Sequence, residues 1–76
     1  MQNNIFIITI FKNKLYHYIK DIIIEDNNSV LPILTTNYND AHIYNFLSAC
    51  ENRNKLNEKR KFKYNNYFLK KVNLSN

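Results

Sequence analysis

The sequence predicts a small α+β domain with an N-terminal β-hairpin, one central helix and C-terminal basic strands. Two observations predict this class. β-Branched and aromatic residues fill most of the first 24 positions, which is typical of strands, and apolar residues recur with helical spacing between positions 41 and 59. A length of 76 residues suffices for one small hydrophobic core, so we expect residues 1–76 to form a single domain.

The first two apolar segments are expected to pair as the hairpin. Residues 4–12 are β-branched and aromatic, which favours a strand buried on both faces. Asn13 lies in the short polar connection that follows and tolerates a left-handed backbone. Residues 15–24 are rich in Tyr and Ile, which favours a second strand. The alternative is an amphipathic helix, because helical spacing also relates Leu15, Tyr18, Ile19, Ile22 and Ile23.

A polar break at residues 25–29 separates the hairpin from a third apolar segment, residues 30–36. Pro32 lies in this segment and has no backbone N–H to donate. The segment is therefore expected to be an edge strand or an irregular stretch.

The central helix is predicted over residues 41–59. Asn39 or Asp40 is a suitable N-cap, and basic residues enrich the C-terminal end, where they complement the helix dipole. We expect the core-facing positions of this helix to be Ile43, Phe46, Leu47 and Cys50.

The C-terminal segment, residues 61–74, divides around Asn65 and Asn66, which suit a two-residue turn because Asn tolerates positive φ. Two strands are expected here, with aromatic and basic side chains on opposite faces. The alternative is a helix, whose apolar stripe would comprise Tyr64, Tyr67, Phe68 and Val72.

The absence of glycine excludes several classes of site. Phosphate-binding loops, dinucleotide fingerprints, nucleophile elbows and EF-hand loops all need glycine where a Cβ atom would clash. A classical zinc finger is excluded because Cys50 is the only thiol and His17 and His42 are the only imidazoles. We expect no cofactor.

Cellular location is inferred from the single cysteine and from the short apolar runs. One cysteine allows no intramolecular disulfide, which favours a reducing compartment. The apolar runs are much shorter than the roughly 20 residues of a membrane-spanning helix, and no basic leader precedes the first of them. We expect a location in the cytoplasm or an organelle interior, with no secretion and no membrane partner.

Positive charge is concentrated in the last third of the chain. Residues 1–50 carry a net charge of −1, whereas residues 51–76 carry +6. This asymmetry indicates an anionic partner, either RNA or DNA or an acidic protein surface. Amino acids with codons rich in A and T supply 46 of the 76 residues, so the base composition of an AT-rich genome accounts for part of the lysine content.

Residues 59–64 interleave four cations with two aromatic rings. Cations neutralise phosphates and aromatic faces stack on unpaired bases, so this combination suits single-stranded nucleic acid. The alternative is an amphipathic strand with its rings in the core and its lysines in water. The candidate nucleic-acid-binding residues are Arg53, Lys55, Lys59, Arg60, Lys61, Phe62, Lys63, Tyr64, Lys70 and Lys71.

Catalytic and metal-binding residues are not expected. On one helix, Cys50 and His42 would lie two turns apart, about 12 Å, which is too far for direct proton transfer. Asp21, Glu25 and Asp26 form the acidic cluster, which is more typical of a solvated loop than of a metal site. Tyr16, His17 and Tyr18 would alternate between the two faces of a strand and so cannot all serve one site.

The sequence therefore indicates a small, basic, non-enzymatic protein that binds nucleic acid or an acidic surface through its C-terminal third. The alternative is a structural or interaction subunit of a larger assembly, or the product of an open reading frame without a discrete biochemical activity. Because so short a chain buries little surface, a homo-oligomer or partner-bound state through an exposed strand edge is also expected.

Overall fold

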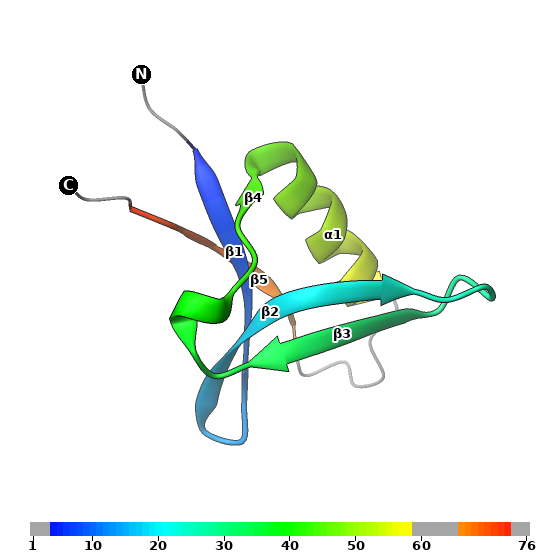
Figure 1. Ribbon diagram of the computed structural model, residues 1–76, viewed down its shortest axis with the longest axis horizontal. Coiled ribbons are helices and arrows are strands. Elements are labelled where there is room, and N and C mark those ends of the chain that lie inside the picture. Colours follow the sequence, from blue (N-terminus) through cyan, green and yellow to red (C-terminus); the bar gives the residue numbers. More distant parts are fainter. Residues whose placement is uncertain (1–3, 59–65, 74–76) are drawn as a thin grey trace.

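The computed structural model describes residues 4–58 and 66–73 and shows a small α+β domain (Figure 1). An antiparallel sheet packs against one helix, and the N-terminal hairpin is confirmed. The elements, in chain order, are β1 (Ile5–Lys12), β2 (Leu15–Ile24), β3 (Val30–Thr35), a 3₁₀ turn (Tyr38–Asp40), β4 (Tyr44–Asn45), α1 (Phe46–Glu58) and β5 (Phe68–Lys71).

Strand β1 is the centre of the sheet. Thr9 pairs with both Tyr18 of β2 and Phe68 of β5, so these two strands lie on opposite edges of β1. Phe6 pairs with β4 on one side and with β5 on the other, so β2 and β4 share an edge. The backbone N–H of His42 donates to the carbonyl of Ile19 at 2.9 Å, which ties the segment before β4 to β2. The sheet is therefore curled rather than flat (Figure 1).

A β-bulge in β2 explains why residues 15–24 also fit a helical pattern. Ile19 pairs with Leu34, but Asp21 pairs with Ile33, so β2 has one extra residue at this point. The extra residue reverses the alternation of side chains along the strand. Consequently Ile19 and Ile22, three positions apart, both contact the same core.

The expected edge strand is confirmed as β3, which is the outermost strand of the order β3-β2-β1-β4. The N–H of Glu25 donates to the carbonyl of Ser29, which marks their pair as hydrogen-bonded. Pairs alternate along an antiparallel ladder, so the Ile22–Pro32 pair is of the non-hydrogen-bonded type. The missing donor of Pro32 therefore falls on the outer edge of β3, where it costs no ladder hydrogen bond.

Residues of β1 are buried on both faces of the sheet, as the sequence predicted. On the helix side, Ile8 and Ile10 join Ile19, Leu56 and Tyr67 in the hydrophobic core. On the other side, Ile7 and Thr9 are also buried. The hydroxyl of Thr9 donates to the carbonyl of His17 at 2.9 Å, so this buried polar group is hydrogen-bonded.

The predicted helix boundary is wrong at its N-terminal end. Helix α1 begins at Phe46 rather than at residue 41, because β4 pairs with Ile5 and Phe6 and holds its two residues extended. The expected cap at Asn39 or Asp40 is also wrong. The side-chain oxygen of Asn45 instead accepts from the N–H of Ser48 at 2.8 Å, which is N-cap geometry.

The predicted core face of the helix is wrong as well. Ile43, Phe46 and Leu47 are exposed, and Cys50 is only half-buried. The buried positions of α1 are Ala49 and Leu56, which lie two turns apart on one face. The small side chain of Ala49 lets the helix lie close to the sheet. The bulkier Phe46 and Leu47, near the beginning of the helix, remain exposed to solvent.

The C-terminal strand is confirmed over Phe68–Lys71, which pairs with β1. The strand expected before it and the turn at Asn65 and Asn66 involve residues 59–65, which lie outside the described residues. The side-chain amide of Asn57 anchors the start of β5 to α1. It accepts from the N–H of Tyr67 at 2.7 Å and donates to the carbonyl of the same residue at 3.0 Å.

The β1–β2 turn yields a first testable prediction. Asn13 and Lys14 have φ values of 53° and 65°, as a two-residue turn between twisted strands requires. A lysine in this region costs about 1–2 kcal/mol, which glycine avoids. Glycine also gives the unfolded chain more conformational entropy, which offsets part of this gain. We therefore expect Lys14→Gly to raise the free energy of unfolding by about 0.5–1 kcal/mol, as measured by urea denaturation. Lys12→Gly, within β1, should lower it, and an unchanged midpoint for Lys14→Gly would contradict the turn assignment.

Candidate functional site

The sheet face opposite α1 carries a row of aromatic side chains. Cross-strand partners and residues two apart share a face, so the register places the side chains of Phe11, Tyr16 and Phe68 on the same side as Thr9. Tyr18 lies on that side too, because it pairs with Thr9. These rings come from three strands, β1, β2 and β5, and they lie on the side of the sheet opposite the core that α1 covers.

The rings on this face contact one another. The ring centroids of Phe11 and Tyr16 lie 4.8 Å apart, and those of Tyr16 and Phe68 lie 6.3 Å apart. Tyr38, from the 3₁₀ turn, packs edge-on against Tyr18 with a centroid distance of 5.4 Å. We call these five residues the aromatic face. Four of them are between 40 and 53 % exposed, namely Phe11, Tyr16, Tyr38 and Phe68.

Lys70 supplies a positive charge to the aromatic face. It lies two residues after Phe68 on β5, and its Nζ atom lies 5.5 Å from the centroid of the Tyr38 ring. This distance is within the range of a cation–π contact, so the ammonium group is held against the ring while its other donors remain in solvent.

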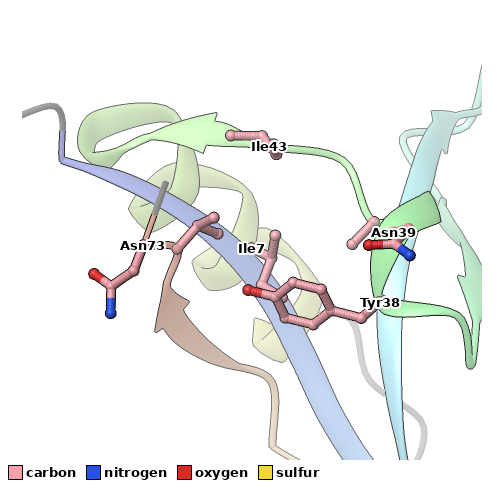
Figure 2. A pocket seen from close by; sticks show the side chains of 7 residues that line it. Ile7, Tyr38, Asn39, Ile43 and Asn73 are labelled. Carbon is pink, nitrogen blue, oxygen red and sulfur yellow. The ribbon is translucent and has the colours of Figure 1, made fainter. Parts of the chain in front are cut away.

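Two cavities of similar size lie on this side of the sheet. The first has a volume of about 230 Å³ and is lined by Thr9, Tyr16, Tyr18, Phe68 and Lys70. The second has a volume of about 210 Å³ and is lined by Ile7, Tyr38, Asn39, Ala41, Ile43, Val72 and Asn73. In Figure 2 the ring of Tyr38 lies across β1 beside Ile7. Of the described residues that line the two cavities, only Lys70 carries a charge.

The two tyrosines with perturbed ionisation belong to the opposite, helix-covered side. Burial raises the pKa of Tyr67, and burial followed by the nearby negative charge of Asp21 raises the pKa of Tyr44. Tyr67 belongs to the hydrophobic core and Tyr44 packs against it, so both phenols serve the fold rather than the aromatic face.

The structure divides the sequence-predicted binding residues among three places. Arg53 and Lys55 belong to α1, on the side of the sheet away from the aromatic face. Lys70 lies on the aromatic face, whereas Lys71 pairs with Phe6 and so lies on the helix side. The remaining candidates, Lys59, Arg60, Lys61, Phe62, Lys63 and Tyr64, lie outside the described residues.

The other side chains singled out in the sequence form no common site. His42 precedes α1 and packs its ring against Tyr44, so the premise that it shares a helix with Cys50 is wrong. Tyr16 and Tyr18 share a face while His17, paired with Ile10, lies on the other, as the sequence predicted. Within residues 4–58 and 66–73, no three His, Cys, Asp or Glu side chains, including those of the acidic cluster, are grouped so that they could hold a metal ion.

Sequence reasoning missed the five residues of the aromatic face as a binding surface. Four of the five showed a signal as alternation: Phe11 lies two positions after Thr9, Tyr16 and Tyr18 are two positions apart, and Phe68 lies two positions before Lys70. Tyr38 showed no such signal. The pattern identifies residues that share a face, but it does not show which face the helix covers.

No protein-family model matches the chain, and comparisons with curated proteins and with solved structures found no significant match. In the part of the chain that the structure describes, no helix is long and apolar enough to cross a membrane.

Proposed function

We propose that this chain is a small, basic, non-enzymatic binding protein whose aromatic face binds single-stranded nucleic acid. The observation that supports the proposal most directly is the set of exposed, mutually contacting rings on the uncovered side of the sheet, with Lys70 among them. This arrangement brings together the two groups that an unpaired strand requires, a flat apolar surface for bases and a cation for phosphate.

The exposure of these rings is more consistent with a role in binding a ligand than with a role in stabilising the fold. Burial of large apolar side chains in a core is favourable, yet Tyr16 is 53 % and Phe68 is 41 % exposed to water. A base that stacks on such a ring removes apolar surface from water, and each stacked base contributes about 1–3 kcal/mol. Every base has a flat face, so this mode of binding tolerates many sequences.

The charge distribution supports an anionic ligand. Residues 51–76 carry a net charge of +6, and within this segment Lys70 lies directly on the aromatic face. Cations near a binding surface attract phosphates over distances of about a Debye length, so they raise the rate of association as well as affinity.

A binding titration with matched variants tests the proposal. We expect the wild-type protein to bind a fluorescent 12-nucleotide oligo-dT, with an affinity that falls as salt rises. Phe68→Ala should weaken binding about 5- to 150-fold, the equivalent of 1–3 kcal/mol for one stacked base. Phe46→Ala is the matched control, because Phe46 is also an exposed phenylalanine but lies at the start of α1.

The two variants also separate binding from stability. Both rings are exposed, so both variants should remain folded by circular dichroism. Equal affinity of the wild type and Phe68→Ala for the oligonucleotide would contradict the proposal, as would affinity that does not change with salt.

A second function, an interaction subunit of a protein assembly, is favoured by a different surface. The β2–β3 hairpin extends beyond the helix, with its connecting loop at the far end (Figure 1). By the β2–β3 register, three exposed aliphatic residues of this hairpin, Ile23, Leu31 and Ile33, share one face. Such a surface is typical of protein contacts, whose strength depends on buried apolar area. This function predicts association that persists at high salt, the opposite of the salt dependence expected for nucleic acid.

A further inference from the structure

We infer that the aromatic face binds a single nucleotide through two separate parts, a cavity that holds the base and the Lys70 ammonium group that binds the phosphate joined to it. This inference rests on the proposed function and makes it more specific, because it identifies the base with its own phosphate as the unit of recognition. It also assigns different roles to exposed rings of the same face. Tyr16 and Phe68 contact the base, whereas Tyr38 is a positioning residue for Lys70.

The base site is the cavity of about 230 Å³. Sites for drug-sized ligands usually have volumes of about 300–1,000 Å³, so this cavity suits a smaller ligand, such as one planar base. Its described lining residues come from β1, β2 and β5 and are Thr9, Tyr16, Tyr18, Phe68 and Lys70. Because three paired strands supply the lining, the fold sets the shape of the cavity before any ligand binds.

Two rings of this lining meet nearly at right angles. The ring planes of Tyr16 and Phe68 are inclined at 77°, and their centroids lie 6.3 Å apart. A flat base cannot lie parallel to both rings, so it stacks on one of them and presents its edge to the other. Aromatic groups favour both of these contacts. Tyr16 and Phe68 are exposed, so a base reaches them without opening the core.

The polar groups of this cavity favour an anion beside the base. The hydroxyl of Thr9 already donates to the carbonyl of His17, so its hydrogen is not available to a ligand. Among the described lining residues there is no Asp or Glu, and Lys70 supplies the only formal charge. An ammonium group has three donors and no acceptor, which suits a phosphate oxygen. Lys71, the next residue, lies on the opposite side of the sheet, so it provides a matched control.

The ammonium group of Lys70 is held by a ring that does not belong to this cavity. Its Nζ atom lies 5.5 Å from the centroid of Tyr38, which is a cation–π distance, and Tyr38 is not among the described residues that line the cavity. The ammonium group covers one face of Tyr38, so a base does not stack there while this contact persists. Tyr18 packs edge-on against the same ring at 5.4 Å. Tyr38 therefore holds the cation of a cavity-lining residue instead of binding a base.

The test compares two probes by NMR titration of the ¹⁵N-labelled full chain. Thymidine has a base and no phosphate, whereas thymidine 5′-methyl phosphate adds the single negative charge of a phosphodiester. We expect the methyl phosphate to bind about 3- to 10-fold more tightly than thymidine, because it adds one charge-assisted contact. Lys70→Gln should bind the two probes equally, whereas Lys71→Gln should keep the preference of the wild type.

Variants of the rings separate the base site from the phosphate site. Tyr16→Ala should weaken the binding of both probes by the same factor, about fivefold or more, because the base loses a ring while the phosphate contact stays. Tyr38→Ala should leave the affinity for thymidine unchanged and remove most of the preference for the methyl phosphate. Tyr38→Phe keeps the ring under the ammonium group, so it should keep that preference. Circular dichroism of each variant checks that the domain remains folded.

Specific results would overturn this inference. If the two probes bind the wild type equally, or if Lys70→Gln keeps the preference, Lys70 does not contact the phosphate. If Tyr38→Ala weakens thymidine binding as Tyr16→Ala does, Tyr38 itself binds a base and the division of roles is wrong. If the 12-nucleotide strand binds and Phe68→Ala weakens it while neither probe binds, the single-nucleotide unit fails but the proposed function stands. If no single strand binds, the proposed function itself fails.

Discussion

Leu56→Ala is expected to lower the free energy of unfolding by about 2–5 kcal/mol, the largest effect of any single substitution considered for this chain. Leu56 is 3 % exposed and contacts the core that Ile8, Ile10 and Ile19 form. Truncation removes buried apolar surface and leaves a cavity that the sheet and helix cannot fully close. Short domains have small free energies of unfolding, so the variant should be largely unfolded at 37 °C.

Leu47→Ala is the matched control, because it makes the same chemical change on the same helix. Leu47 is 68 % exposed, so its truncation should change the free energy of unfolding by no more than about 0.5 kcal/mol. Urea denaturation followed by circular dichroism measures both. A larger loss for Leu47→Ala than for Leu56→Ala would show that α1 presents the face predicted from sequence rather than the face seen in the structure.

The N-terminal hairpin could be predicted from sequence because its determinants are local. Residues 4–12 are apolar at almost every position, and Asn13 lies where a positive φ is needed. The ambiguity in the second strand has a physical origin in the bulge of β2. Because one extra residue brings Ile19 and Ile22 to the same core, a bulged strand acquires the three-residue spacing that is otherwise typical of a helix.

The start and the face of α1 could not be predicted because both depend on distant residues. The two residues of β4 are extended because they pair with Ile5 and Phe6, which lie 40 and 38 positions earlier in the chain than their partners Asn45 and Tyr44. Once the helix begins at Phe46, the sheet contacts the face that holds Ala49 and Leu56. The apolar spacing within the helix alone predicts that the bulkier residues face the core. Contact with the sheet instead buries the face with Ala49, whose small side chain lets the helix backbone approach the sheet.

The aromatic face was only partly accessible to sequence reasoning for a similar reason. The combination of cations and rings was interpreted as suited to nucleic acid, and their clustering along the sequence drew attention to residues 59–64, which lie outside the described residues. In the structure, the rings come together from three strands and a 3₁₀ turn that are separated by up to 57 positions, from Phe11 to Phe68. Only the pairing of β1 with both β2 and β5 places them side by side.

Asn57→Ala is expected to lower the free energy of unfolding by about 1–3 kcal/mol and to release the start of β5. The side chain of Asn57 makes two hydrogen bonds with the backbone of Tyr67, at 2.7 and 3.0 Å, as a neighbouring strand would. Tyr67 is buried, so its N–H and C=O would lose partners in a place where water compensates poorly. The higher helix propensity of alanine returns only about 0.5 kcal/mol of this loss.

Amide hydrogen exchange distinguishes this specific effect from general destabilisation. In Asn57→Ala, the Tyr67 amide should exchange much faster than the amides of β1 and β2, because the anchor of β5 opens locally. Asn54→Ala is the control on the same helix. Asn54 is exposed, and within residues 4–58 and 66–73 its side chain accepts hydrogen bonds only from the adjacent Arg53, so its replacement should leave Tyr67 protected. If the Tyr67 amide hydrogen still exchanges slowly in Asn57→Ala, the Asn57 side chain does not anchor the start of β5. Because β5 carries Phe68 and Lys70, the same opening should weaken the binding that we propose for the aromatic face, on the side of the sheet opposite α1.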